Sequence, residues 1–432
     1  MIKLPYHKGF IEFGDEDENI NGVLVSRAYE YETREPEEEI VEAALDRPIG
    51  SGRLEELIKE KKNMVIITSD HTRPVPSRVT LPIVLRRARL ANPGIDIKIV
   101  VATGTHRTAT REEMIGKFGA EIVDNEKIIV HDANDGANMI SLGRLDTGLD
   151  AEVSRTVAET EFLMAEGFIE PHFFAGFSGG RKSVFPGVAS LRCVMANHCS
   201  EYIGDPKARA GALENNPVHA EALEMAARAG LKFILNVVIN KEKRIIRAFA
   251  GHFDAAHRAG CAFVREMSSV EPAPADIVIT TNGGYPMDRD IYQAVKCMTA
   301  AEATCKKGGV IIAAAGCCDG HGGENFYRTF RDACSPREVT DSILMRSRVD
   351  TIADQWQSQI LARVLEKFTV ILVSKMENKK IVEDMFMHYA ENIDRAVEMA
   401  KEIINSAGTT AINNDNRATI TVIPDGVSVI VG

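Results

Sequence analysis

Short apolar segments alternate with amphipathic segments along most of the chain, and this alternation restricts the fold more than any other feature of the sequence. Residues 64–70 (MVIITSD) and 97–104 (IKIVVATG) have the mainly apolar character of strands that are buried on both faces. A polar loop and then a segment with helical spacing follow, as in VTLPIVLRRARLA at 79–91. We therefore predict an α/β fold with mainly parallel, helix-covered sheets.

The chain is long enough for two such domains. With 432 residues it exceeds the usual size of one core, and the segment SSVEPAPAD at 268–276 places two prolines among small and polar residues just before a new strand, IVITTN. We predict domains at 1–270 and 271–432. Within the first, Asn216 and Pro217 are typical of the cap and first turn of a helix that ends near Gly230.

The charge and cysteine pattern exclude several classes of protein. The formal net charge of −11 argues against a general nucleic-acid or anionic-membrane binder, and we expect neither partner. The longest apolar runs have the length of strands, so we expect no membrane span. The eight cysteines are scattered without a CxxC pair, which favours reduced thiols in a cytoplasmic protein.

The segment PHFFAGFSGGRKSVFPG at 171–187 resembles a phosphate-binding loop but departs from it in two ways. Arg181 stands where a Walker loop has its last glycine, and Pro186 with Gly187 interrupts the helix that should follow. Lys182 remains as an anion-binding group, a nucleophile or an attachment point, or as a surface cation beside a turn. A kinase or ATPase that clamps phosphate with Lys182 stays open as an alternative, as does a binding protein without catalytic activity.

Polar residues just after predicted strands are the best candidates for catalysis, because ligands of open α/β sheets bind beyond the carboxyl ends of strands. His106, in ATGTHRT, and His172 have the position of general acids or bases. Asp70, His71, Thr72 and Arg73 follow another strand, and Arg73 precedes a proline that keeps it extended. It could bind a carboxylate or phosphate, or form a structural ion pair with Asp70.

Further candidates each have a structural alternative. His198 falls at the end of a short helix at 190–197, where a core or helix-end role competes with metal binding. Tyr292, Gln293 and Lys296 share a predicted helix that could simply face solvent. Trp356 could cover a ligand or anchor a helix. Cys317 and Cys318 could bind a soft metal, although a strained glycine loop with incidental thiols is the simpler interpretation.

Nine segments together resemble the lactate racemase family, the 2-hydroxyacid racemases that depend on a nickel-pincer nucleotide. The resemblance spans both predicted domains in order. The segments are SDHTRPVPS, ATGTHR, GFIEPHFFAGFSGGRKSVFPG, MANH, TTNGGYP, IYQAVKCMTAAEAT, DGHGGE, DQWQSQ and TVIPDGVSVIV.

This resemblance implies a cofactor and a role for each candidate. The cofactor, pyridinium-3,5-bisthiocarboxylic acid mononucleotide nickel, would be attached covalently to Lys182, with His198 as the protein ligand of its nickel ion. His106 and His172 match the acid/base pair. Asp70, His71, Thr72 and Arg73 match residues that contact the cofactor, Arg73 also contacting substrate. The remaining substrate-binding residues match Tyr292, Gln293, Lys296 and Trp356.

The resemblance further implies that the chain interconverts L- and D-lactate by reversible hydride transfer, with a pyruvate intermediate. It assigns cofactor binding and catalysis to 1–270, substrate-binding residues to 271–432, and the active site to the cleft between them. Cofactor-biosynthesis enzymes would then be needed for activation. A racemase or epimerase of another short 2-hydroxyacid with the same cofactor is the alternative. Cys317 and Cys318 have no place in the family pattern.

Overall fold

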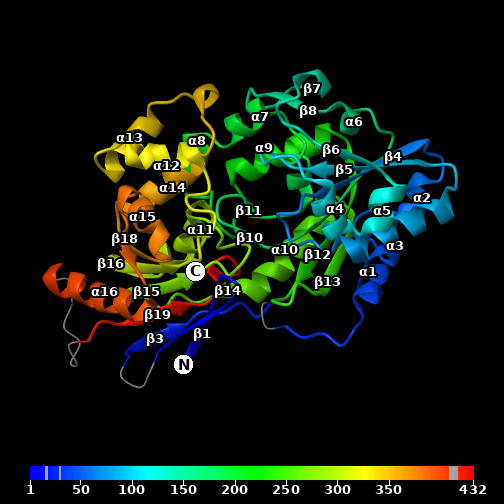
Figure 1. Cartoon of the computed structure of the whole chain (residues 1–432). Helices are drawn as coiled ribbons and strands as arrows, with labels where there is room; N and C mark the ends of the chain where they lie inside the picture. Colours follow the sequence, from blue (N-terminus) through cyan, green and yellow to red (C-terminus); the bar gives the residue numbers. More distant parts are fainter. Residues whose placement is uncertain (15–17, 29–30, 408–416) are drawn as a thin grey trace. The chain divides into compact units, whose positions relative to one another are not determined.

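The computed structural model describes residues 1–14, 18–28, 31–407 and 417–432, which form two compact units (Figure 1). Unit 1 comprises Met1–Ser26, His198–Gly204 and Ser268–Gly432, and unit 2 comprises Arg27–Asn197 and Asp205–Met267. Each unit is an α/β structure with mainly parallel strands, as the alternating pattern predicted. Among the described residues, no helix combines the length and apolar character that crossing a bilayer requires.

Unit 2 is built on a six-stranded sheet of order β13-β12-β9-β4-β5-β6. Its neighbouring strands are parallel except β12 and β13, which pair antiparallel. The six strands are β4 (Asn63–Ser69), β5 (Asp96–Ala102), β6 (Lys127–Val130), β9 (Leu163–Phe168), β12 (Leu231–Ile239) and β13 (Ile245–His252). Its smaller strands are β7 (Met139–Arg144), β8 (Asp150–Ser154), β10 (Pro171–His172) and β11 (Gly176–Phe177).

Both faces of this sheet are covered, which explains its continuous apolar strands. On β4, Met64 and Ile66 join one apolar cluster, whereas Val65 and Ile67 join another on the opposite face. The helices of unit 2 are α1 (Glu37–Asp46), α2 (Leu54–Ile58), α3 (Ser77–Ala91), α4 (Arg111–Phe118), α5 (Ala120–Asn125), η1 (Gly136–Asn138), α6 (Arg155–Ala158), η2 (Gly180–Ser183), α7 (Leu191–Asn197), α9 (Pro217–Arg228) and α10 (Ala255–Ser268). Helices α1, α2 and α3 pack on the first face, and α7 and α9 on the second.

Unit 1 has a fully parallel six-stranded sheet of order β18-β17-β16-β15-β19-β3. Its strands are β3 (Ile20–Val23), β15 (Ala275–Thr281), β16 (Cys305–Ala314), β17 (Thr369–Val373), β18 (His388–Ala390) and β19 (Ile420–Ile423), with the smaller pairs β1 (Ile2–Tyr6)–β2 (Gly9–Phe13) and β14 (Ser269–Val270)–β20 (Ile430–Val431). Its helices are α8 (Ser200–Gly204), α11 (Ile291–Glu302), α12 (Glu324–Arg331), α13 (Pro336–Leu344), η3 (Arg348–Asp350), α14 (Gln355–Leu365), η4 (Met376–Asn378), α15 (Lys379–Asp384) and α16 (Ile393–Ala407).

The units differ from the predicted domains 1–270 and 271–432 in two segments and by three residues at the boundary, since unit 1 already includes 268–270. Met1–Ser26 and His198–Gly204 belong to unit 1, although they precede the proline-rich boundary in sequence. The first segment joins unit 1 because β3 pairs with β19 at the edge of the sheet. A four-residue edge strand carries no local signal for which sheet it joins, so the sequence alone did not place it.

The cap at the start of α9 matches its prediction. Asn216 is the N-cap, and its Oδ1 accepts hydrogen bonds from the backbone N–H groups of Val218 and His219 at 3.1 and 3.2 Å. Pro217 follows at the first helical position, where its missing N–H is tolerated. The same Asn216 side chain donates to the carbonyl of Phe174 at 2.9 Å, which fixes the start of α9 to the 171–187 segment.

Gly176 is a sharp test of how tightly this segment is packed. Its φ of +78° is strained for other residues, and a Cβ added there would lie 2.2 Å from the carbonyl oxygen of Ala212. We expect Gly176→Ala to lower the free energy of unfolding by about 2–4 kcal/mol, measured by urea denaturation with far-UV circular dichroism.

Gly116→Ala is the matched control for this prediction. Gly116 lies in α4, and an added Cβ meets nothing within 4 Å, so alanine should raise stability by about 0.5–1 kcal/mol. A Gly176→Ala chain that unfolds at the wild-type urea concentration would contradict the packing described here.

Candidate active site

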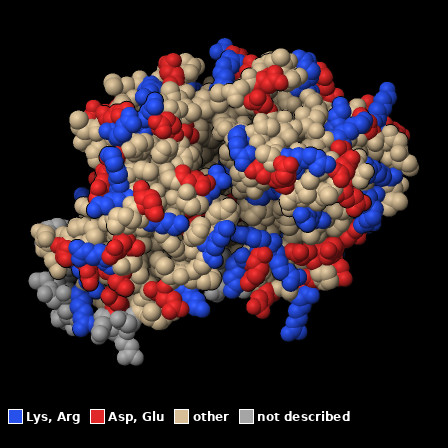
Figure 2. All heavy atoms as spheres, in the orientation of Figure 1, with Lys and Arg blue, Asp and Glu red and all other residues tan. Residues whose placement is uncertain are grey.

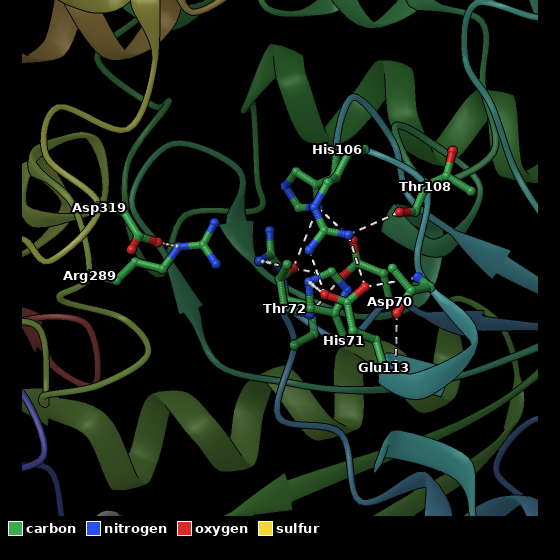
Figure 3. A network of polar contacts seen from close by, with 11 residues as sticks. Asp70, His71, Thr72, His106, Thr108, Glu113, Arg289 and Asp319 are labelled. Atoms are coloured by element: carbon green, nitrogen blue, oxygen red, sulfur yellow. Dashed lines mark hydrogen bonds and ion pairs between the residues drawn. The ribbon is translucent and has the colours of Figure 1, made fainter. Parts of the chain in front are cut away.

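Three neighbouring strands of unit 2 bring the candidate residues of that unit to one edge of its sheet. Strands β9, β4 and β5 are adjacent and parallel, so the loops that follow Phe168, Ser69 and Ala102 all start at the same edge. The second and third loops carry Asp70 and His106, which point toward one another in Figure 3. The loops that follow β4 and β5 therefore bring Asp70 and His106 into direct contact, which their spacing in the sequence does not show.

His106 is held by Asp70. Its Nδ1 lies 2.7 Å from Asp70 Oδ2, and the carboxylate also accepts hydrogen bonds from the Thr72 backbone N–H (3.0 Å) and hydroxyl (2.6 Å) at Oδ1. Asp70 is buried, whereas the His106 side chain is 37% exposed. A carboxylate at Nδ1 places a ring proton there and leaves Nε2 to exchange protons with a ligand.

Asp70 keeps its negative charge despite its burial. Burial alone would raise the pKa of its carboxyl group, but the hydrogen bond and charge of His106, the charge of Arg73 and the Thr72 hydroxyl together hold that pKa well below its usual range. Because the pKa is depressed in the folded chain, the pair adds stability above about pH 4 and loses it as the pH falls further. Asp70 is therefore ionised throughout the neutral range.

The rest of the 70–73 segment is fixed by neighbours on several elements. Arg73 Nη1 donates to the Thr72 hydroxyl at 3.0 Å, and the His71 Nε2 lies 3.3 Å from Glu113 Oε1 on α4 (Figure 3). The Arg73 carbonyl accepts a hydrogen bond from Lys117 Nζ at 2.8 Å. Burial lowers the pKa of Lys117 to about 8, with Glu166 and Asp70 opposing that shift.

Lys182 lies in a loop that glycines and buried polar groups shape. The short 3-10 helix η2 carries it, and the next helix, α7, begins only at Leu191, so no helix N-terminus adjoins the lysine as it would in a Walker loop. Gly179 has a φ of +74°, and a Cβ there would lie 2.8 Å from the Phe168 carbonyl oxygen. The Gly180 backbone N–H donates to Asn236 Oδ1 at 2.8 Å.

The lysine meets one of the predicted acid/base histidines. Lys182 Nζ lies 3.0 Å from His172 Nε2, and 5.5 Å from the ring centroid of Phe174. This loop also contacts the loop that carries His106, because the Gly104 N–H donates to the Gly187 carbonyl at 3.0 Å. Unit 2 therefore contributes two polar pairs, Asp70–His106 and His172–Lys182, from loops that touch.

In unit 1, three of the predicted residues form an aromatic cluster. The rings of His198 and Trp356 meet edge to face with centroids 4.8 Å apart, and Trp356 Nε1 donates to the Tyr292 hydroxyl at 2.8 Å. Tyr292 and Trp356 come from α11 and α14, and His198 directly precedes the Cys199–Ser200 start of α8. The His198 ring therefore packs against the indole ring of Trp356.

Gln293 and Lys296 lie on α11, as predicted. The backbone N–H of Gln293 donates to the N-cap residue Asp290 at 2.7 Å, and the buried Gln293 Oε1 has no hydrogen-bond partner among the described residues. A buried amide oxygen without a partner is costly, so a ligand group that donates to it would stabilise the site.

Three supporting groups were missed by the sequence reasoning. Glu166, buried in β9, accepts hydrogen bonds from the hydroxyls of Ser77 (2.5 Å), Thr68 and Thr80. A carboxylate inside an otherwise apolar strand was a signal that could have revealed it. The other two, Arg181 and Lys117, gave no such signal, because nothing local shows that their cationic heads are buried or hydrogen-bonded to backbone carbonyls.

Cys317 and Cys318 lie in the glycine-containing loop that follows β16. Cys317 is buried with a φ of +42° after β16, and Cys318 is exposed. Burial raises the pKa of the Cys317 thiol, which disfavours the thiolate that a metal needs. Across the described parts of the chain, no three His, Cys, Asp or Glu side chains gather where they could hold a metal ion.

Basic and acidic side chains are interspersed over the face drawn in Figure 2. Among the described residues on that face, they form no extended basic surface of the kind that tracks a nucleic-acid backbone. This distribution agrees with the net charge of −11.

Comparison with known proteins gives one family throughout. Residues 6–211 match the model of the lactate racemase N-terminal domain, and residues 270–431 match that of the lactate racemase C-terminal domain. The chain is 53% identical over 430 residues to a lactate racemase of Thermoanaerobacterium thermosaccharolyticum and 50% identical over 430 residues to one of Lactiplantibacillus plantarum. Each match covers 100% of this chain and 99% of the relative.

Solved structures agree with the sequence comparison. The lactate racemase apoprotein from Thermoanaerobacterium thermosaccharolyticum superimposes with a TM-score of 0.94 at 52% identity, covering 100% of this chain and 99% of that one. A Thermotoga maritima protein shares the fold, with a TM-score of 0.64 at 19% identity over 92% of this chain and 98% of that one. Because the chain shares 50–53% sequence identity with these relatives over its full length, it belongs to the lactate racemase family.

Proposed function

We propose that this chain interconverts L- and D-lactate with a nickel-pincer nucleotide attached covalently to Lys182. The relatives that match over the full length are lactate racemases, and the chain is accordingly an isomerase. The observation that carries the mechanistic part of the proposal is the pair of imidazoles in touching loops, each with a fixed partner at Nδ1. Asp70 faces Nδ1 of His106, and the Ala175 backbone N–H faces Nδ1 of His172.

The residues present fit the proposed cofactor. Lys182 offers an amine for the covalent link, in a loop where Gly179 and Gly180 leave no room for larger side chains. A borderline metal such as nickel accepts imidazole together with soft donors, so His198 is a suitable protein ligand when the cofactor provides the other donors. Arg73 supplies hydrogen-bond donors for its phosphate, and the Thr72 hydroxyl orients Arg73 by accepting from its Nη1. When bound, the cofactor supplies a reversible acceptor for the α-hydride of lactate.

The two histidines divide the proton chemistry between them. With its proton at Nδ1 toward Asp70, neutral His106 presents a bare Nε2 that can take the proton of the substrate hydroxyl. His172 accepts a backbone N–H at Nδ1, so its neutral ring carries the proton on Nε2 and can donate a hydrogen bond to a substrate oxygen, whereas it gives a proton only when the ring is charged. Pyruvate is planar at C2, and the two enantiomers present their hydroxyls on opposite sides, so one base and one acid in opposite states serve each direction.

Substrate binding needs positive charge that the acidic chain otherwise lacks. Arg73 presents a guanidinium fork suited to a carboxylate, and the Lys117 hydrogen bond to its carbonyl keeps its backbone in place. We propose that unit 1 contributes the other substrate-binding groups, Gln293 and Lys296 with Tyr292 and Trp356. The unsatisfied Oε1 of Gln293 supports this assignment for the first of them.

The substrate is tested with a panel of single enantiomers. Protein from a host that makes the cofactor should convert L-lactate and D-lactate to the same mixture, with a higher kcat/KM than for 2-hydroxybutyrate or malate, as measured by chiral chromatography. Cofactor-loaded protein that leaves lactate unchanged defeats the proposal, and turnover of another 2-hydroxyacid in its place establishes the alternative substrate.

Attachment at Lys182 is tested by intact mass and nickel content. Wild-type protein should carry added mass and nickel, Lys182→Ala should carry neither, and His106→Gln should keep the adduct while losing activity, because its imidazole acts on substrate rather than on the link. An adduct that survives on Lys182→Ala would refute the attachment site.

The role of Asp70 is tested by Asp70→Asn. The amide cannot supply the negative charge that stabilises the charged His106 ring, so we expect kcat to fall about a hundredfold or more with the adduct retained. Asp132→Asn is the matched control, because exposed Asp132 follows β6 and its side chain accepts hydrogen bonds from the backbone and side chain of Asn134. Equal kcat values for the two variants would show that Asp70 has no catalytic function.

A further inference from the structure

One turn of α11 carries both Gln293 and Lys296, and a side chain from outside the helix contacts the backbone of that turn. In an α-helix the carbonyl of residue i pairs with the N–H of residue i+4, as the Gln293 carbonyl and the Cys297 N–H do across this turn. The Nδ2 of Asn282 donates to the Gln293 carbonyl at 2.5 Å, and its Oδ1 accepts from the Cys297 N–H at 3.0 Å. Asn282 therefore bridges the two ends of the turn that contains Lys296.

Asn282 reaches this turn from the sheet of unit 1. It directly follows β15 and is 2% exposed. The second proton of its Nδ2 goes to the Met287 carbonyl at 2.7 Å. Because the amide faces one N–H group and two carbonyls, exchanging its oxygen and nitrogen would oppose like groups. The side chain thus has one orientation that satisfies all three contacts.

A second buried amide holds the preceding carbonyl of the same helix. Gln357 on α14 is fully buried, and its Nε2 donates to the Tyr292 carbonyl. Two consecutive carbonyls of α11, those of Tyr292 and Gln293, therefore accept hydrogen bonds from side chains of other elements. Side chains that enter the hydrogen-bond ladder of a helix change its local bend. The path of α11 at 292–297 thus depends on Asn282 and Gln357 as well as on its own helical hydrogen bonds.

Neither amide is needed to begin the helix. The first three backbone N–H groups of α11 each donate to an acceptor elsewhere in unit 1: Ile291 to the Gly320 carbonyl, Tyr292 to the His321 carbonyl and Gln293 to Asp290 Oδ1. These bonds satisfy the groups that a helix N-terminus leaves exposed. Asn282 and Gln357 therefore act on the turn that follows the cap, where Gln293 and Lys296 project.

The direction of this turn matters because long side chains amplify its rotation. Gln293 and Lys296 reach a ligand only when the backbone that carries them is correctly placed, and an error of about 1 Å in a positioning group can lower a rate by about a hundredfold. The buried Gln293 Oε1 has no hydrogen-bond partner among the described residues, so its placement relative to a ligand depends on the backbone.

We propose that the buried side-chain amides of Asn282 and Gln357 are positioning residues for substrate binding, which fix the turn of α11 that presents Gln293 and Lys296. The inference rests on the proposed function in taking Gln293 and Lys296 as substrate-binding residues. It adds that their geometry is set from beneath the helix, by two amides that do not themselves touch substrate.

Asn282→Asp tests the inference with almost no change of shape. The aspartate oxygen that replaces Nδ2 faces the carbonyls of Gln293 and Met287 and cannot donate to both. An equal mixture of L- and D-lactate undergoes no net conversion by a racemase, so calorimetry on cofactor-loaded protein gives a dissociation constant for lactate. We expect this constant to rise at least tenfold, with the mass adduct retained because Lys182 belongs to unit 2.

Asn378→Asp is the matched control. Asn378 is also a buried asparagine of unit 1, and its Nδ2 donates to the Cys317 carbonyl at 3.0 Å and to the Ser374 hydroxyl at 3.1 Å. Its dissociation constant for lactate should stay within twofold of wild type. A wild-type constant in folded Asn282→Asp, or an equal rise in both variants, overturns the inference.

Gln357→Met covers the case in which Asn282→Asp does not fold. Methionine has a similar length and suits a fully buried position, but it removes the donor to the Tyr292 carbonyl. We expect the dissociation constant for lactate to rise at least fivefold. A folded, adduct-carrying Gln357→Met protein with the wild-type constant overturns the inference.

A double-mutant cycle separates positioning from general support of the fold. Asn282→Asp should lower kcat/KM at least tenfold in wild type but at least threefold less in a Lys296→Met background, because a group that the amide positions is absent there. Equal factors in the two backgrounds indicate a merely structural role and overturn the inference.

Failure of the proposed function gives a different result. Loaded wild-type protein that binds another 2-hydroxyacid in place of lactate defeats the proposed substrate, and the same variants measured with that acid then decide the role of the two amides. Wild-type protein that racemises lactate, together with variants that bind it equally well, defeats only the inference.

Discussion

The parallel pairing of β9, β4 and β5 is the constraint on which the unit 2 site depends. Parallel strands deliver their carboxyl ends to one edge, so the loops after Phe168, Ser69 and Ala102 leave the sheet together. The hydrogen bond from Gly104 to Gly187 then joins two of these loops directly. Everything proposed for catalysis in this unit follows from side chains that such an edge can place within hydrogen-bond distance.

Buried polar groups keep these loops in one conformation. Glu166 draws the hydroxyls of β4 and α3 toward β9, and the Asn236 side chain holds the Gly180 backbone. Arg181 donates to two carbonyls of the segment that contains Lys182. Each group would be costly to bury alone, and the hydrogen bonds named here form only when its loop adopts the observed path. The loops of the site are therefore held by buried side chains of unit 2 and not by contacts with a ligand.

His106 and His172 differ in the hydrogen-bond partner at Nδ1, and this partner determines which role Nε2 has in the neutral ring. A carboxylate at Nδ1 makes His106 an acceptor at Nε2, whereas backbone N–H groups at Nδ1 make His172 a donor at Nε2. The same side chain thus presents a hydrogen-bond acceptor in one loop and a hydrogen-bond donor in the other.

The sequence by itself determined the α/β class, strands such as β4, β5 and β15, and the Asn216 cap, because these follow from periodicity and from contacts between residues a few positions apart. Long motifs around Lys182 and His106 also indicated the family. Only the tertiary structure decided that Met1–Ser26 joins the C-terminal unit, that Glu166 and Arg181 support the site, and that His172 Nδ1 faces a backbone N–H group. Those outcomes depend on partners distant in sequence or on the exact path of a loop, and short-range patterns contain no record of either.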